Sequence, residues 1–135
     1  MKKLFSTKYS DRSITLSLLI LRLTLGGLMV PHGYQKLMKF AAMSKGFPDP
    51  FHVGSTASLS MTIFAEFFCA VFIVLGLMTR LACIPLIIAM SVAVFSAHKG
   101  DIFGQGEHAA LFLFGFVALL FSGPGKFSMD RVIGK

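Results

Sequence analysis

The chain has 135 residues, of which 55% are hydrophobic and 14% are charged, and its mean hydropathy is +0.76. Because charged residues make up about a quarter of a soluble domain, this composition excludes an ordinary water-soluble globular protein. The formal net charge of +7 indicates contact with anionic lipid headgroups rather than with nucleic acid, for which the sequence carries no recognition motif.

Four long apolar segments follow one another, at about residues 14–38, 57–78, 80–98 and 107–122. A bilayer core about 30 Å thick is crossed by about 20 helical residues, so the first three segments are long enough and the fourth is slightly short. We predict an all-α protein with one membrane domain over residues 1–135, folded as a four-helix transmembrane bundle.

The first apolar segment follows several basic residues, so a cleaved signal peptide is the alternative interpretation. Its apolar core is longer than the roughly 7–15 residues of a signal peptide and contains Arg22, which favours a retained helix. With the N-terminus inside, the inner side holds eight Lys and Arg residues and the outer side four. The positive-inside rule therefore predicts that both termini are cytoplasmic.

Two charged residues lie deep within predicted helices. Counting about 1.5 Å per residue, Arg22 lies roughly 12 Å in from the inner start of the first helix, and Glu66 roughly 14 Å in from the outer start of the second. Either charge alone would cost about 2.5–3.5 kcal/mol at the centre of a membrane. We therefore expect an Arg22–Glu66 ion pair, which in the alternative interpretation only fixes helix packing.

Further titratable residues lie at the predicted outer ends of three helices. His32 and Lys36 share a face of the first helix, His98 ends the third, and Glu107 and His108 begin the fourth. Intramembrane ionisable groups usually face the bundle interior or a hydrated cavity. We predict a polar pocket in the outer half of the bundle, floored by Arg22 and Glu66. Each of the other residues could instead be wetted by headgroups, and Glu107 could simply complement the helix dipole.

The spacing of these residues limits the chemistry of the pocket. The sequence has no HExxH or ExxH motif, so we assign no metal ligand. His32 and His98 could hold a haem if they lie at equal depth. "GQGEHA" lies between membrane helices rather than in a βαβ unit, which excludes a dinucleotide site. Recognition of a polar head on an apolar molecule, such as a quinone or a lipid, fits best.

The stretches "RLTLGGLMVPHGYQKL", "AEFFCAVFIVLGLMTR", "AHKGDIFGQGEHAALF" and "GPGKFSMD" resemble motifs of the DoxX family of small four-helix membrane proteins. The resemblance implies a multi-pass protein of the bacterial inner membrane. Some relatives are subunits of thiosulfate:quinone oxidoreductase, and others assist redox enzymes under oxidative or thiol stress. The recurrent polar positions of the family correspond to Arg22, Gly33, Lys36, Glu66, His98 and Glu107.

Two functions are compatible with these observations. The first is a membrane subunit of a quinone-linked or stress-related oxidoreductase system that binds a quinone or lipid-like headgroup, with membrane lipid and a redox protein or further copies of the chain as partners. The second is a non-catalytic scaffold or assembly subunit whose charges only fix helix packing. Solute permeation ranks last, because there is little polarity on the cytoplasmic side of Arg22. Whether the chain turns over a substrate stays open.

Overall fold

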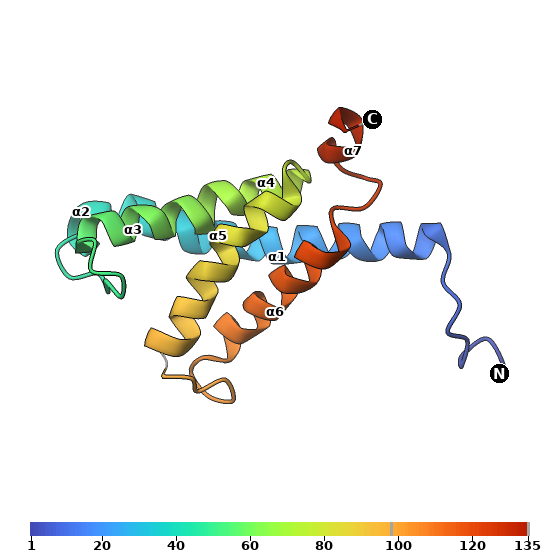
Figure 1. Ribbon diagram of the computed structural model, residues 1–135, viewed down its shortest axis with the longest axis horizontal. Coiled ribbons are helices and arrows are strands. Elements are labelled where there is room, and N and C mark those ends of the chain that lie inside the picture. Colours follow the sequence, from blue (N-terminus) through green and yellow to red (C-terminus); the bar gives the residue numbers. More distant parts are fainter. Residues whose placement is uncertain (98, 135) are drawn as a thin grey trace.

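The computed structural model describes residues 1–97 and 99–134, and all regular structure within them is helical (Figure 1). In chain order, the elements are α1 (Asp11–Met38), α2 (Phe40–Met43), α3 (Ser55–Ile63), the π-helical η1 (Phe64–Cys69), α4 (Ala70–Leu75), α5 (Thr79–Val92), the π-helical η2 (Ala93–Ala97), α6 (Glu107–Ser122) and α7 (Met129–Ile133).

The long helices occupy the four predicted segments. Their ends lie within three residues of the predicted bounds, apart from residue 98, which is outside the described residues. Elements α3, η1 and α4 form one helix, Ser55–Leu75, and α5 continues into η2. In the described part of the chain, three helices are long and apolar enough to cross a membrane, whereas α6 is apolar but has 16 residues. The all-helical fold is confirmed; the fourth crossing and the cytoplasmic termini remain predictions.

Helix α1 is much longer than its neighbours. It starts where the Ser10 hydroxyl caps it by accepting from the Ser13 N–H at 3.1 Å, and Asp11 in its first turn complements the helix dipole. Its 28 residues span about 42 Å, compared with a hydrocarbon core of about 30 Å. The N-terminal turns of α1 consequently project beyond the other helices (Figure 1).

Two glycines set the register between α1 and the second long helix. A Cβ atom at Gly33 would lie 2.5 Å from the Phe67 backbone nitrogen, and one at Gly26 would lie 2.7 Å from the Val74 side chain. Only glycine allows the two backbones to approach this closely. Gly33 is therefore level with η1, and Gly26 is level with α4.

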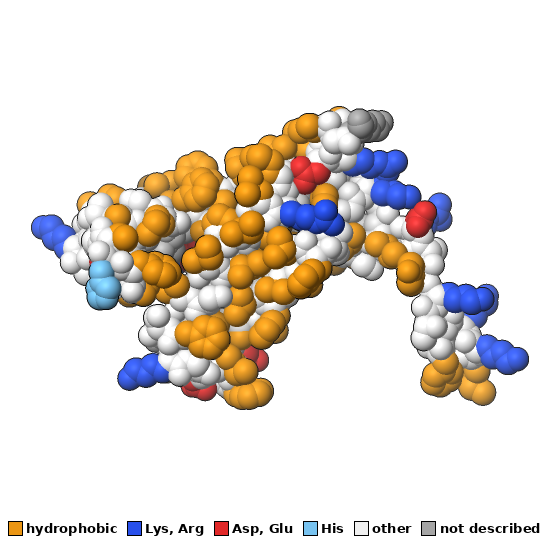
Figure 2. Space-filling model, in the orientation of Figure 1, with side chains coloured by type: hydrophobic (Ala, Val, Ile, Leu, Met, Phe, Trp, Pro, Cys, Tyr) orange, Lys and Arg blue, Asp and Glu red, His pale blue; other side chains and the backbone are white. Residues whose placement is uncertain are grey.

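The helices α5 and α6 pack side by side and cross α1 obliquely (Figure 1). The tight turn before α5 uses left-handed backbone at Gly76, with φ of 70°, and at Met78, with φ of 47°. Side chains from all the long helices fill the core, with Phe116 and Leu86 fully buried. Apolar side chains also cover the face seen in Figure 2, as expected for helices in lipid, whereas Lys and Arg gather near the two termini.

Candidate functional site

The candidate site is built around an ion pair between α1 and η1. The Lys36 Nζ lies 2.5 Å from the Glu66 Oε2, and the two side chains are 22% and 8% exposed. The close Gly33 contact, one turn before Lys36, brings the last turns of α1 against η1. An unpaired charge within the membrane would be costly in free energy, and here each side chain is paired with the opposite charge of the other.

The pair lies at a cavity of about 220 Å³ between α1, η1, α5, η2 and α6. A second cavity of about 200 Å³ shares His32 and Lys36 with the first. Together they fall within the range of about 300–1,000 Å³ that is typical of small-molecule sites. The first cavity is lined by Met29, His32, Lys36, Glu66, Met90, Ala93, Gln105, His108, Ala109 and Phe112.

The lining has a polar part and an apolar part. His32, Lys36, Glu66 and His108 were predicted for the pocket from the sequence, and the fold brings these four residues together. The His32 ring meets the Phe112 ring edge to face, with 6.2 Å between their centroids. Methionines and Phe112 supply flexible and aromatic apolar walls. The cavity can therefore hold a molecule with a polar edge and an apolar ring.

Two of the helices that flank the cavity have π-helical turns at this level. Glu66 belongs to η1, and the lining residue Ala93 begins η2. A π-helical turn contains an extra residue, which redirects side chains, and such turns occur often at functional sites. Here the π-helical turn in the second helix carries the carboxylate that faces Lys36.

Arg22 occupies a different environment from the predicted one. The expected Arg22–Glu66 ion pair is wrong, because Glu66 pairs with Lys36. Within the described residues, the guanidinium of Arg22 donates to backbone oxygens alone. Arg22 is 2% exposed. Its acceptors are Ile73 O at 3.0 Å, Val74 O at 3.0 Å, Pro124 O at 2.9 Å and Phe127 O at 2.5 Å.

The physical reason for this difference is the stagger of the two helices. The prediction measured both depths from helix ends at the membrane surface, whereas α1 begins at Asp11 and extends past Leu75, where the second helix ends. Arg22 is therefore level with Ile73, which is about 10 Å along the helix from Glu66. The last four carbonyl groups of a helix lack intrahelical partners, and α4 offers two of them to the guanidinium.

The other predicted residues take no part in the cavity, as far as the structure describes them. Gly33 is a helix-packing residue against the backbone of Glu66 and Phe67. Glu107 begins α6, is exposed and does not line the cavity, so its position fits the helix-dipole interpretation. His98 lies outside the described residues, and the haem alternative depends on it.

Sequence reasoning missed several lining residues. Gln105 comes from the loop before α6, three residues ahead of His108, and its polar side chain so near a predicted site residue was a usable signal. Gln35 and Lys39 line the adjoining cavity and follow the same face of α1 as His32. Met29, Met90 and Phe112 gave no signal, because apolar residues on these helices are common.

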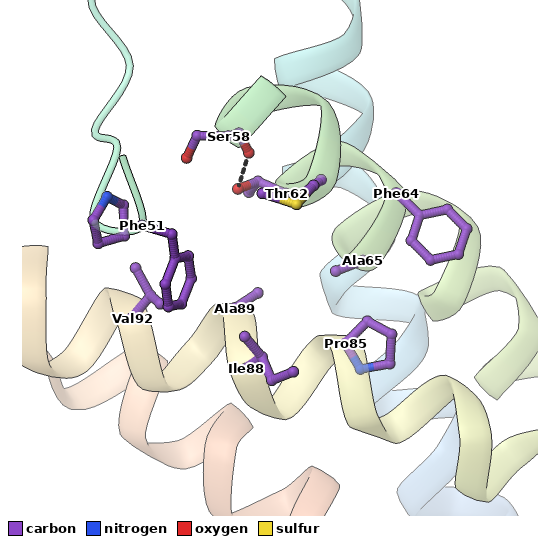
Figure 3. Close-up of a pocket in the computed structure, with 11 residues that line it drawn as sticks. Phe51, Ser58, Thr62, Phe64, Ala65, Pro85, Ile88, Ala89 and Val92 are labelled. Atoms are coloured by element: carbon purple, nitrogen blue, oxygen red, sulfur yellow. Dashed lines mark hydrogen bonds between the residues drawn. The ribbon is translucent and has the colours of Figure 1, made fainter. Parts of the chain in front are cut away.

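A separate apolar cavity lies on the other side of η1 and α5 (Figure 3). It has a volume of about 260 Å³ and contacts Ala65 and Ala89, the neighbours of Glu66 and Met90 in the chain. Its few polar groups are already bonded, since the Thr62 hydroxyl donates to the Ser58 carbonyl at 2.9 Å (Figure 3). The titratable groups therefore gather on the α1 and α6 side.

Comparison with known proteins gives the family. The DoxX family model matches residues 17–99, which span α1 to α5 and end before α6. Uncharacterized membrane protein Rv3486 of Mycobacterium tuberculosis is 32% identical over 142 residues, covering 88% of this chain and 82% of that protein. No solved structure matches the chain. With the family model covering more than half of its length, this chain is a membrane protein of the DoxX family.

Proposed function

We propose that the cavity beside Lys36 and Glu66 binds the polar headgroup of a quinone or a similar lipid-like molecule. In this proposal the protein is a subunit of a quinone-linked or stress-related oxidoreductase system of the bacterial inner membrane. The observation that carries the proposal is an ion pair that lies at a cavity of about 220 Å³ with His32 and His108 on its wall.

The chemistry of the lining suits a quinone ring. Within the described residues, the Lys36 ammonium uses one of its three donors for Glu66, so it can also donate to a quinone carbonyl oxygen. The Phe112 ring and the methionines offer apolar contacts to the ring faces. A charge-assisted hydrogen bond inside a membrane is strong because water does not compete for it.

Proton exchange is the second capability of the site. A histidine ring can accept a proton at one nitrogen and donate one at the other, and His32 and His108 both line the cavity. Reduction of a quinone to a quinol takes up two protons and two electrons. We assign the protons to these histidines and the electrons to a redox protein partner, so that this chain supplies the headgroup site.

Equilibrium dialysis of the detergent-solubilised protein against a short-tailed ubiquinone tests the proposal. Loss of a hydrogen bond to a charged group costs about 1.5–3 kcal/mol, so Lys36→Gln raises the Kd about 10- to 150-fold. Glu107→Gln is the matched control, because Glu107 is exposed and does not line the cavity. Unchanged binding by Lys36→Gln would contradict the proposal.

The alternative function is a scaffold in which the Lys36–Glu66 pair only joins α1 to η1. The tight Gly33 contact beside the pair favours this role. The exchange variant Lys36→Glu/Glu66→Lys separates the two, because it keeps a salt bridge but moves the ammonium to the other helix. A scaffold regains thermal stability and partner assembly, whereas a headgroup site regains stability without quinone binding.

A further inference from the structure

A second polar cleft lies at the opposite end of α1 from the Lys36 site. Its volume is about 510 Å³, and it lies between the first two turns of α1 and the segment that follows α6. Basic side chains from both segments line it, namely Arg12, Lys126 and Arg131. We propose that this cleft binds the phosphate group of an anionic phospholipid.

The position of the cleft along α1 matches the headgroup layer. Arg22 lies level with the end of the second helix, and Arg12 is ten residues earlier in the chain. This separation places Arg12 about 15 Å further toward the aqueous side, beyond the hydrocarbon core. Leu16 and Phe127 also line the cleft and are 46% and 60% exposed, so they can contact the glycerol and upper acyl region of a lipid.

The charge of the cleft complements a phosphate. Three cations and one carboxylate, Asp11, line it, which gives a local net charge of +2. Asp11 lies 3.3 Å from the Lys126 Nζ, but their side chains are 86% and 51% exposed, so this pair is weak and exchangeable. Guanidinium groups bind phosphate through two parallel hydrogen bonds, and Arg12 and Arg131 come from opposite walls of the cleft.

The second wall of the cleft is held in place by buried contacts. Arg22 donates to the carbonyl groups of Pro124 and Phe127, on either side of Lys126. The Ser128 hydroxyl accepts from the Arg131 N–H at 3.3 Å, which starts α7. Because these contacts fix the backbone that carries Lys126 and Arg131, less conformational entropy is lost when a ligand binds.

Inorganic phosphate would offer the same oxygen atoms as a phospholipid. We commit to the lipid because the cleft lies at headgroup depth and has an apolar rim, and because basic clefts at the cytoplasmic ends of membrane helices typically bind acidic lipid headgroups. The surface view agrees, since Lys and Arg side chains gather where α1 and the C-terminal segment meet (Figure 2).

Native mass spectrometry of the full chain with equal amounts of phosphatidylglycerol and phosphatidylcholine tests the proposal. We expect the wild type to retain phosphatidylglycerol at least fivefold over phosphatidylcholine. In Arg12→Gln/Arg131→Gln this preference falls at least fivefold, since each basic residue near a membrane surface contributes about a fivefold effect. Lys45→Gln/Lys99→Gln, which removes the same charge from exposed sites elsewhere, retains the preference.

Three further outcomes decide the assignment. Asp11→Asn removes a carboxylate that repels phosphate and so raises phosphatidylglycerol retention, whereas an unchanged or lower value would count against the cleft. Equal loss of preference in both double variants would mean a general charge effect and overturn the proposal. Displacement of the lipid by millimolar inorganic phosphate would assign the site to the free anion instead.

Discussion

Two cations on α1, the buried Arg22 and the partly buried Lys36, differ in what neutralises them. Arg22 is satisfied by four backbone carbonyl oxygens from α4 and the C-terminal segment, while Lys36 is satisfied by the carboxylate of Glu66 beside a cavity. Carbonyl groups cannot release a proton or change charge, so the Arg22 cluster can only hold the structure together. An ammonium–carboxylate pair beside a cavity can exchange partners with a ligand, and Lys36 is also the more exposed of the two cations, at 22% against 2% for Arg22.

The strongest test of this comparison replaces Arg22 with methionine. Because Ile73 O also accepts from the Gly76 N–H at 3.1 Å, the change leaves up to three carbonyl groups without a partner. We expect a loss of about 3–5 kcal/mol in the free energy of unfolding. Arg22→Lys rescues little, because a single ammonium nitrogen cannot reach both the α4 carbonyl groups and those of the C-terminal segment, which the guanidinium contacts through different nitrogens. Unfolding in detergent, followed by circular dichroism, measures the effect. A near wild-type stability would remove the structural role of the cluster.

The corresponding change at the other cation is Lys36→Met. Glu66 then lacks its partner in a low-dielectric site, and we expect a loss of about 2–3 kcal/mol in unfolding free energy. Lys36→Met/Glu66→Leu removes both charges and recovers most of this stability, although it still binds no quinone. If the double variant is as unstable as the single one, packing rather than charge explains the loss.

The contact that positions the pair is tested by Gly33→Ala. The new Cβ would lie 2.5 Å from the Phe67 nitrogen, so the helices must separate at a cost of about 1–3 kcal/mol. Gly27→Ala is the matched control, because a Cβ there meets nothing within 4 Å. We expect it to be neutral or to stabilise by about 0.5–1 kcal/mol. Thermal unfolding of both variants gives the comparison, and equal effects would contradict the proposed register.

The smallest expected effect concerns the C-terminal side of the Arg22 cluster. The Asp130 carboxylate accepts from the Met78 N–H at 2.6 Å and the Thr79 N–H at 2.9 Å, at the start of α5. Asp130→Ala removes this cap and costs about 1 kcal/mol. Limited proteolysis after residue 122 should accelerate accordingly, and an unchanged cleavage rate would show that the Arg22 contacts and the backbone bond from the residue 130 N–H to Gly76 O are enough to hold the segment.

The sequence predicts the positions of the helices well, because each long helix must be apolar throughout. The grouping of His32, Lys36, Glu66 and His108 also follows from their places in the predicted helices, since three lie near the predicted outer ends and Glu66 lies on the predicted pocket floor. The partner of each charge was not predictable from depth, since it depends on the stagger of α1 against α4. That stagger is set by contacts at Gly26 and Gly33, whereas a Cβ at the adjacent Gly27 would meet nothing within 4 Å.

The C-terminal segment was predicted only as the end of the last helix. Nothing in "GPGKFSMD" indicates that its carbonyl groups face Arg22, because backbone oxygens are present at every position and carry no sequence signal. The role of Asp130 was also not predictable, because an acidic residue after a helix is usually exposed and its pattern in the sequence does not indicate a distant partner. Interactions between side chains and distant backbone atoms are the part of a fold that residue patterns describe least.

The wide sequence separation within the Arg22 cluster has a consequence for biosynthesis. The acceptors of the guanidinium lie 51, 52, 102 and 105 residues further along the chain. When the ribosome has delivered only the first helix to the insertion machinery, this cation has none of them, and its insertion is opposed by about 2.5–3.5 kcal/mol. Stable assembly therefore waits for residues 124–127, and we expect nascent chains stopped before Pro124 to be targets of membrane proteases.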